Sequence, residues 1–242
     1  MTLIVPMYHR ASAGRHGNAA EMLDAHFAFI ARHCRCVLPG EPLDPQRLNV
    51  CPTFDDAYFD FYAVVFPMLL KHGLRAVLAV PISAIGEDTD SPEPVRLQAC
   101  SQRLHDCRPL GAYCTWAELA EMAASGSISI ASHGFTHTRL DQRAQDLRTE
   151  IVAPRAILAE RTGRAVDSFV LPYGRFNAQT IACARQHYRY VFRIGSADNR
   201  GWAGKLLYRV DADEMQSPEA LFSKQRLASY RWRRRWNALR AR

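Results

Sequence analysis

The sequence lacks several features that would assign its class at once. It has no apolar run approaching the roughly 20 residues that span a bilayer, and the N-terminal MTLIVPMYHR has neither a basic leading region nor an apolar run long enough for a secretory signal. We therefore expect a cytoplasmic protein. No internal repeat or clear linker interrupts its 242 residues, which favours a single folded domain.

A CxxC pair is also missing from the seven cysteines. An odd number of cysteines without a dense pattern is typical of a reducing compartment rather than of a disulfide scaffold. Cys100, Cys107 and Cys114 recur every seven residues with His105 between them, so that a zinc site is conceivable. Without a CxxC pair, we interpret these cysteines as ordinary buried or free thiols.

Acidic residues are absent from the last twelve residues, RWRRRWNALRAR, which contain six arginines. These arginines account for all but one of the seven net positive charges of the chain. The basic character therefore belongs to a C-terminal tail at 229–242 that follows a body of residues 1–228. Because the body is close to neutral, we expect no nucleic acid partner.

The tail itself supports several interpretations. If it is helical, Trp232, Trp236 and Leu239 form one apolar stripe among arginines. Such a helix suits an anionic membrane surface, with the protein peripheral on the inner face of the membrane. It could equally dock a partner glycosyltransferase through residues 230–242 or contact a substrate diphosphate. The plainer alternative is a helix that packs its tryptophans onto the body and leaves its arginines in solvent.

Short apolar runs alternate with helical patterns along the chain. The runs predict strands at 2–8, 49–54, 74–81, 127–132, 167–172 and 188–194. The helical patterns lie at 61–73, 115–126, 140–163 and 177–187. This alternation predicts parallel strands with helices outside them, in a barrel or an open sheet. Residues 83–113 are Pro-rich with little periodicity, and we predict a loop or lid there.

Polar residues suited to chemistry follow the predicted strands. In parallel α/β folds, functional side chains gather beyond the carboxyl ends of the strands. The residues found there are His9, Asp55, Asp56, His133, His137 and Pro172-Tyr173-Gly174. Each is weak evidence alone, because an Asp-Asp pair usually caps a helix and HxxxH is frequent on solvated helices. Their combination at strand ends predicts one shared pocket.

Asp56, His133 and His137 form a predicted metal-ligand set. One carboxylate and two imidazoles suit a borderline divalent ion, zinc first and cobalt, nickel or iron as alternatives, and leave positions for water. Asp55, next to this set, is placed to take a proton from metal-bound water. The combination predicts hydrolysis of a carbonyl compound, with the oxyanion held by the metal and a backbone N–H.

The same residues resemble the motifs of the polysaccharide deacetylases, carbohydrate esterase family four. Thr53-Phe54-Asp55-Asp56 resembles the family's TFDD motif, SHGFTH at 132–137 its SHxxTH motif, and FVLPYG at 169–174 its motif ending in PYG. The similarity runs from about residue 48 to 195, and the opening PMYHR looks like members that begin with a Tyr-His strand. It implies a distorted (β/α) barrel with seven or eight strands and metal-dependent N- or O-deacylation of an acylated sugar.

The resemblance assigns a role to each matched position. It implies that Asp55 is the general base and that the backbone N–H of Tyr173 donates a hydrogen bond to the oxyanion. The metal ligands are Asp56, His133 and His137, and the residues expected to bind substrate are Pro172, Gly174 and Arg175.

Two parts of the family pattern are missing. Val170 stands where many members have an arginine that pairs with the base aspartate, and no late Leu-x-His motif supplies the general acid. A subgroup with a third motif of the FAYPYG type resembles this chain in both respects, and YRVD at 208–211 resembles its late Arg-Ile segment. Our candidate for the general acid is His9, and the alternative is that His9 is only a packed histidine at the barrel rim. Arg175 is a candidate to orient the base aspartate.

Two functions of different classes follow. The leading hypothesis is a cytosolic enzyme that removes an acetyl or formyl group from a nucleotide-linked or lipid-linked sugar in bacterial surface polysaccharide or lipopolysaccharide (O-antigen) biosynthesis. The alternative is a catalytically inactive sugar-binding or scaffold protein on the same fold, suggested by the missing arginine and late histidine. Retention of Asp55 beside the metal ligands argues for the enzyme.

Overall fold

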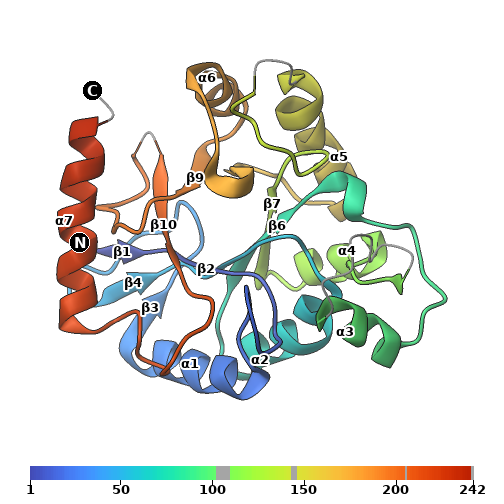
Figure 1. Cartoon of the computed structure of the whole chain (residues 1–242), viewed down its shortest axis with the longest axis horizontal. Helices are drawn as coiled ribbons and strands as arrows, with labels where there is room; N and C mark the ends of the chain where they lie inside the picture. The colour runs from blue at the N-terminus through green and yellow to red at the C-terminus, as the bar shows by residue number, and fades with distance from the viewer. Residues whose placement is uncertain (102–109, 143–145, 205, 241–242) are drawn as a thin grey trace.

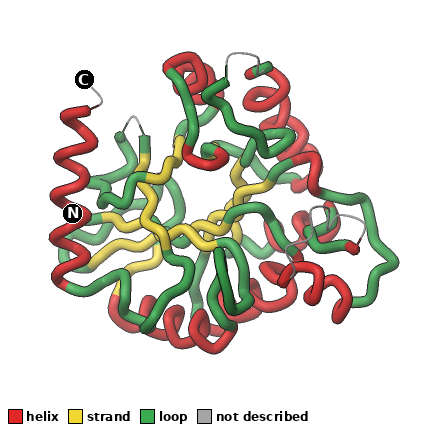
Figure 2. Tube along the Cα trace, viewed as in Figure 1, coloured by secondary structure: helices red, strands yellow, loops and turns green. Residues whose placement is uncertain are grey.

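The fold is a closed barrel of parallel strands, seen in a computed structural model that describes residues 1–101, 110–142, 146–204 and 206–240. The barrel closes in the order β10-β2-β5-β6-β7-β8-β9, and Figure 2 draws its strands in yellow. Its strands are β2 (Pro6–Tyr8), β5 (Thr53–Phe54), β6 (Ala76–Val80), β7 (Ile128–Ser132), β8 (Ser168–Val170), β9 (Tyr190–Ile194) and β10 (Leu207–Asp211). The prediction of a distorted (β/α) barrel with seven or eight parallel strands is confirmed.

Two of the predicted strands are divided. Residues 2–8 form β1 (Leu3–Ile4) and β2, and residues 49–54 fall into β4 (Leu48–Val50) and β5. The first halves, β1 and β4, form a separate parallel sheet with β3 (Cys34–Cys36) in the order β1-β4-β3, while the second halves, β2 and β5, join the barrel. Pro6 opens β2 and Pro52 precedes β5, positions where a residue without an N–H costs the ladder little.

Helices surround the barrel (Figure 1). They are α1 (Ala20–His33), α2 (Phe66–Lys71), α3 (Glu93–Ser101), α4 (Trp116–Ala124), α5 (Ala153–Thr162), α6 (Ala178–His187) and α7 (Lys224–Arg240). Turns of π-helix, Phe61–Val65 and Arg148–Val152, lead into α2 and α5. The predicted caps are present, since Thr115 and Glu118 form a capping box on α4 and Asn177 caps α6.

Three predictions about helices need correction. Helix α1 was not predicted, although Leu23, Phe27 and Ile30 follow helical spacing and are all buried. Segment 83–113 is not only a loop, because it contains α3. The helical pattern predicted from residue 140 begins at Arg148, and Leu140 instead forms a β-bridge with Phe176.

Burial on both faces explains why the barrel strands read as continuous apolar runs. All five residues of β6 are buried. Val77 and Ala79 pack with one cluster, and Ala76, Leu78 and Val80 pack with another. Parallel strands covered on both sides need no polar face. Polar residues are therefore informative mainly at the strand ends.

Candidate active site

A cavity of about 780 Å³ lies where the carboxyl ends of the barrel strands meet. Its wall includes residues that follow different strands: His9 after β2, Asp55 and Asp56 after β5, His133 after β7 and Asp213 after β10. The barrel thus brings together side chains that are far apart in the sequence, as the strand-end rule predicted for all of these residues except Asp213.

The three predicted metal ligands converge in this cavity. One ligand atom each from Asp56, His133 and His137 lies within 4.8 Å of the others. The Asp56 Oδ1 atom is 3.7 Å from His133 Nε2 and 3.3 Å from His137 Nε2, and it is buried without a hydrogen-bond partner. A buried carboxylate oxygen is costly without a partner. A divalent cation would satisfy it, so the donor set fits a zinc-type ion.

His133 is held in the state that a ligand needs. Its Nδ1 is 2.9 Å from the Val170 carbonyl oxygen, which can only accept, so Nδ1 carries the proton and Nε2 is left with its lone pair. Burial lowers the pKa of His133 to about 4, although the Asp55 charge opposes this shift. The imidazole is therefore neutral at neutral pH.

Asp55 is paired with Arg209, the arginine of the YRVD segment, to which sequence reasoning gave no role. Arg209 on β10 donates from Nη1 to Asp55 Oδ1 at 2.6 Å and from Nη2 to Oδ2 at 2.9 Å, and the two residues are only 1% and 4% exposed. Burial alone would raise the pKa of Asp55, but the Arg209 guanidinium and the neighbouring imidazoles hold it well below its usual range. The prediction that Arg175 orients this carboxylate is wrong, because Arg209 occupies that place.

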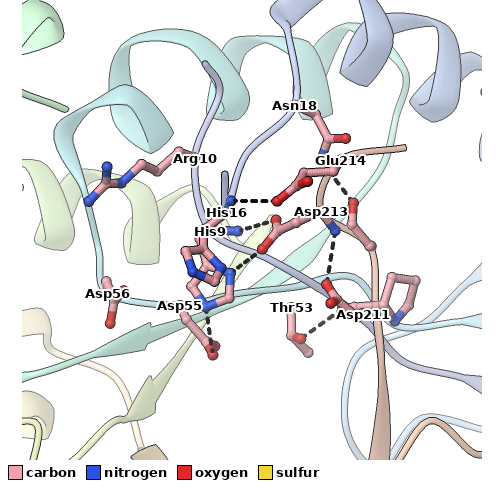
Figure 3. A network of polar contacts seen from close by, with 12 residues as sticks. His9, Arg10, His16, Asn18, Thr53, Asp55, Asp56, Asp211, Asp213 and Glu214 are labelled. Atoms are coloured by element: carbon pink, nitrogen blue, oxygen red, sulfur yellow. Dashed lines mark hydrogen bonds and ion pairs between the residues drawn. The ribbon is translucent and has the colours of Figure 1, made fainter. Parts of the chain in front are cut away.

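His9 lies between two carboxylates (Figure 3). Its Nδ1 is 2.6 Å from Asp213 Oδ2, its backbone N–H donates to Asp213 Oδ1 at 3.2 Å, and its Nε2 is 3.8 Å from Asp55 Oδ2. Burial would lower the pKa of His9, but the hydrogen bond to Asp213 and the charge of Asp55 raise it to about 9. The ring is therefore protonated at neutral pH, with Nε2 directed into the cavity.

The Pro172-Tyr173-Gly174 turn contributes mainly Tyr173 to the cavity wall. The Tyr173 ring lies 4.6 Å from the His137 ring and is 56% exposed. Pro172, Gly174 and Arg175 are not among the described residues that line the cavity. Gly174 has a positive φ of 60°, and a Cβ there would meet the Ile194 side chain at 3.2 Å. The predicted contacts of these three residues with substrate stay predictions.

Left-handed backbone is concentrated at the site. Asp56, His137 and Tyr173 have φ values of 74°, 54° and 56°. Such angles are costly for residues other than glycine and persist where the surroundings enforce them. Two of the predicted metal ligands and the tyrosine of the PYG turn thus depend on strained backbone, which is typical of functional sites.

The family can now be identified. The family model for polysaccharide deacetylase matches residues 44–191, more than half of the chain. The chain belongs to the polysaccharide deacetylase family. The curated protein YxkH of Bacillus subtilis (strain 168), a polysaccharide deacetylase by name, is 25% identical over 194 residues. These cover 76% of this chain but only 61% of that protein's length.

Solved structures agree on the fold. Streptococcus pyogenes deacetylase PplD in complex with acetate has a TM-score of 0.70 at 22% identity, covering 91% of this chain and 96% of that one. IcaB from Ammonifex degensii has a TM-score of 0.67 at 22% identity, covering 88% and 92%. A de-N-acetylase from Aggregatibacter actinomycetemcomitans has a TM-score of 0.70 at 20% identity, covering 95% of this chain and 100% of that one. At these identities the likeness establishes the deacetylase fold alone.

The deacetylase SHxxTH loop is braced by Glu150, which sequence reasoning also missed. The Glu150 carboxylate accepts the N–H groups of Phe135 and Thr136, both at 3.1 Å, and the Thr136 hydroxyl at 2.6 Å. A Cβ on Gly134, whose φ is 85°, would meet Glu150 Oε2 at 3.3 Å. Glu150 therefore fixes the loop between His133 and His137. The signal that could have identified Glu150 from the sequence is that it is a single acidic residue on the buried side of the helix at 148–162.

The cysteine interpretation holds where the structure describes it. Cys100 and Cys114 are buried free thiols that donate to the carbonyl oxygens of Ala112 and Tyr58. Cys107 and His105 lie outside the described residues. Within the described ranges, the metal-type cluster found is that of Asp56, His133 and His137. No described helix is both long and apolar enough to cross a membrane.

Proposed function

We propose that the protein is a metal-dependent hydrolase that removes an N-acyl group, acetyl or formyl, from a sugar. The observation that carries this proposal is one cavity holding a three-residue cation site, an ionised Asp55 and a protonated His9. A base, an acid and a cation site are the groups that amide hydrolysis requires. Family membership supports the same reaction class.

Each residue has a distinct part in the proposed mechanism. A divalent cation, when bound by Asp56, His133 and His137, supplies Lewis-acid polarisation of the acyl carbonyl and of the attacking water. Asp55, kept ionised by Arg209, accepts a proton from that water. His9 donates its Nε2 proton to the amine nitrogen as the C–N bond breaks, while Asp213 stabilises the imidazolium. The backbone N–H of Tyr173 is our candidate donor to the oxyanion.

The role of His9 predicts the alkaline limb of the pH profile. An acid with a pKa of about 9 is protonated below that pH, so activity should be retained up to that range and fall as the pH rises through about 9. In His9→Gln we expect kcat to fall by about 10²-fold or more, with loss of the alkaline limb. Steady-state rates between pH 6 and 10.5 measure this. An unchanged limb in the variant would assign proton donation to another group.

The alternative of an inactive binding protein rested on the missing arginine and the missing late histidine. In the structure, Arg209 pairs with Asp55 and His9 faces the cavity beside Asp213. Both observations support the hydrolase over that alternative.

The cavity also contains a cation suited to an anionic substrate group. Arg10 lies in the wall, with Nη2 donating to the Tyr58 hydroxyl at 2.9 Å and the guanidinium carbon 4.3 Å above the Tyr58 ring. These contacts fix the guanidinium and leave further N–H donors for an acceptor. We therefore propose a phosphate-linked substrate, a nucleotide-linked or lipid-linked sugar. Such sugars serve surface polysaccharide and lipopolysaccharide assembly on the cytoplasmic side of bacterial membranes.

Arg10→Gln tests this substrate class. We expect KM for a phosphate-linked sugar to rise by about 10- to 100-fold, because a charge-assisted hydrogen bond contributes roughly 1.5–3 kcal/mol. The same variant should hydrolyse an uncharged N-acyl sugar as the parent does. Equal effects on both substrates would contradict phosphate recognition by Arg10.

The reaction itself is tested by acylate release. The protein would be reconstituted in turn with zinc, cobalt and nickel and offered N-acetyl and N-formyl sugars, both free and phosphate-linked. Release that requires metal and stops on chelation would support the proposal. A protein that holds stoichiometric metal yet releases nothing from any substrate would favour the binding protein, and a protein that binds no metal would refute the central hypothesis.

A further inference from the structure

The C-terminal helix α7 presents its aromatic side away from the barrel. Leu227 and Tyr230 pack with Ile4 and Val210, and Tyr230 is buried. Farther along, Arg234 Nε donates to Asp198 Oδ1 at 2.8 Å, and Asn237 Nδ2 donates to the Gly195 carbonyl at 3.1 Å. These anchors fix the rotation of the helix about its axis.

The opposite side is apolar and exposed. Trp232, Trp236 and Leu239 are 61%, 45% and 64% exposed. At about 100° per residue, their mean direction is roughly opposite to that of the anchoring residues Leu227, Tyr230, Arg234 and Asn237. The two indole rings stack on each other, with centroids 5.7 Å apart and planes 12° apart. The alternative in which the tryptophans pack onto the body is therefore wrong. The predicted boundary at 228/229 falls inside α7.

Arginines flank this aromatic stripe on both sides. By the same helical spacing, Arg231 and Arg235 lie along one edge, and Arg226 and Arg233 along the other. All four are exposed, and Lys224–Arg240 contains no acidic residue. Arg234 is different, because its guanidinium is used to anchor the helix to Asp198.

We propose that this face of α7, comprising Trp232, Trp236 and Leu239 with the flanking arginines, docks on an anionic lipid surface. Indole rings favour the interface between headgroups and acyl chains, and arginines beside them attract anionic headgroups. Charge complementarity favours lipid over a protein of mixed charge. The stacked indoles favour a lipid surface over nucleic acid, because one short basic patch would bind nucleic acid through phosphate contacts alone.

The position of α7 connects this surface with the cavity. Asn237 bonds to Gly195, and the preceding residue, Ile194, lines the cavity. In Figure 1, α7 runs along one side of the barrel beside β1 and β10. Docking would hold the cavity wall near the lipid surface. If the proposed deacylation is correct, this favours the lipid-linked sugar over the nucleotide-linked one.

Vesicle flotation of the full chain tests the proposal. We expect binding to vesicles of phosphatidylcholine with 30% phosphatidylglycerol (about one anionic lipid in three) and little binding to phosphatidylcholine alone. Arg231→Gln/Arg235→Gln should weaken partitioning roughly thirtyfold, at about 1 kcal/mol per arginine and tenfold per 1.4 kcal/mol. Trp232→Ala/Trp236→Ala should weaken it at least as much. Matched controls are Arg32→Gln/Arg185→Gln, which removes two exposed charges elsewhere, and Leu70→Ala, an exposed apolar residue of α2.

The outcomes separate lipid docking from other occupants and from catalysis. Neither α7 double variant changes the cavity, so acylate release from a soluble substrate should stay at the parent level. Absence of binding to anionic vesicles, or equal binding by the tryptophan variant, overturns the proposal. A concentration-dependent dimer that the tryptophan variant abolishes would instead assign this face to a second copy of the chain. Salt-sensitive binding to RNA without flotation would assign it to nucleic acid.

Discussion

Asp55→Asn is expected to reduce acylate release by about 10²- to 10⁴-fold while the protein keeps its metal. Asparagine preserves the size of the side chain, but its amide cannot accept the proton from the attacking water. The proposed metal ligands Asp56, His133 and His137 are unchanged, so metal content should stay near one ion per chain. Single-turnover acylate release and elemental analysis on the same sample measure both quantities.

A matched control separates the effect of removing the Asp55 carboxylate from the effect of removing a carboxylate anywhere in the chain. Asp24→Asn removes a charge on α1 whose partners, Lys71 and His72, are remote from the cavity. It should leave turnover unchanged. If Asp55→Asn retained activity within about tenfold of the parent, the base would lie elsewhere. If it lost its metal as well, Asp55 would belong to the cation site rather than act as the base.

Arg209→Met is expected to cost about 3–5 kcal/mol of unfolding free energy, the usual effect of breaking a buried ion pair. Asp55 would remain buried without its bidentate partner, and the Arg209 side chain is itself almost fully buried. Replacing both residues, in Arg209→Met/Asp55→Asn, should recover much of this loss because no uncompensated charge is left. Urea unfolding of the four proteins in chelator gives the coupling energy.

The pH dependence of this loss has a definite sign. In the parent, the pKa of Asp55 is depressed, so its stabilising contribution is present above the unfolded pKa and is lost only as the pH falls through the lower folded value. Without Arg209, burial dominates and raises the pKa of Asp55. In the variant, the ionised buried carboxylate lowers the free energy of unfolding at pH 7. Protonation of this carboxylate restores part of that free energy as the pH falls. The difference between parent and variant should shrink from pH 7.5 to pH 5, and a constant difference would contradict this account.

Local sequence patterns predicted most of the metal and base assignments because these depend on strand ends. A strand in a parallel barrel delivers the next residues to one rim, so Asp55, Asp56 and His133 could be brought together without coordinates. Continuous apolar runs located β6 and β7 for the same reason, since both faces of these strands are covered.

The missed residues act across the barrel. Arg209 is 154 positions from its partner Asp55, and Asp213 is 204 positions from His9. No helical or strand period links such positions. LYRVD at 207–211 is short and contains two charged residues, Arg209 and Asp211, so its pattern did not indicate a buried strand. The arginine sought near the PYG turn was supplied instead by β10, because ring closure places β10 next to β2 and within reach of β5.

The sequence by itself determined the family resemblance, the parallel strands with helices outside them, the candidate cation-binding set and the concentration of positive charge at the C-terminus. These rest on local order: residue type, spacing and position relative to a strand. Only the tertiary structure decided that Arg209 holds Asp55, that Asp213 holds His9, and that Tyr230 rather than Trp232 or Trp236 faces the barrel. Each of these outcomes depends on which surfaces meet when the ring closes, and that geometry is a property of the whole fold.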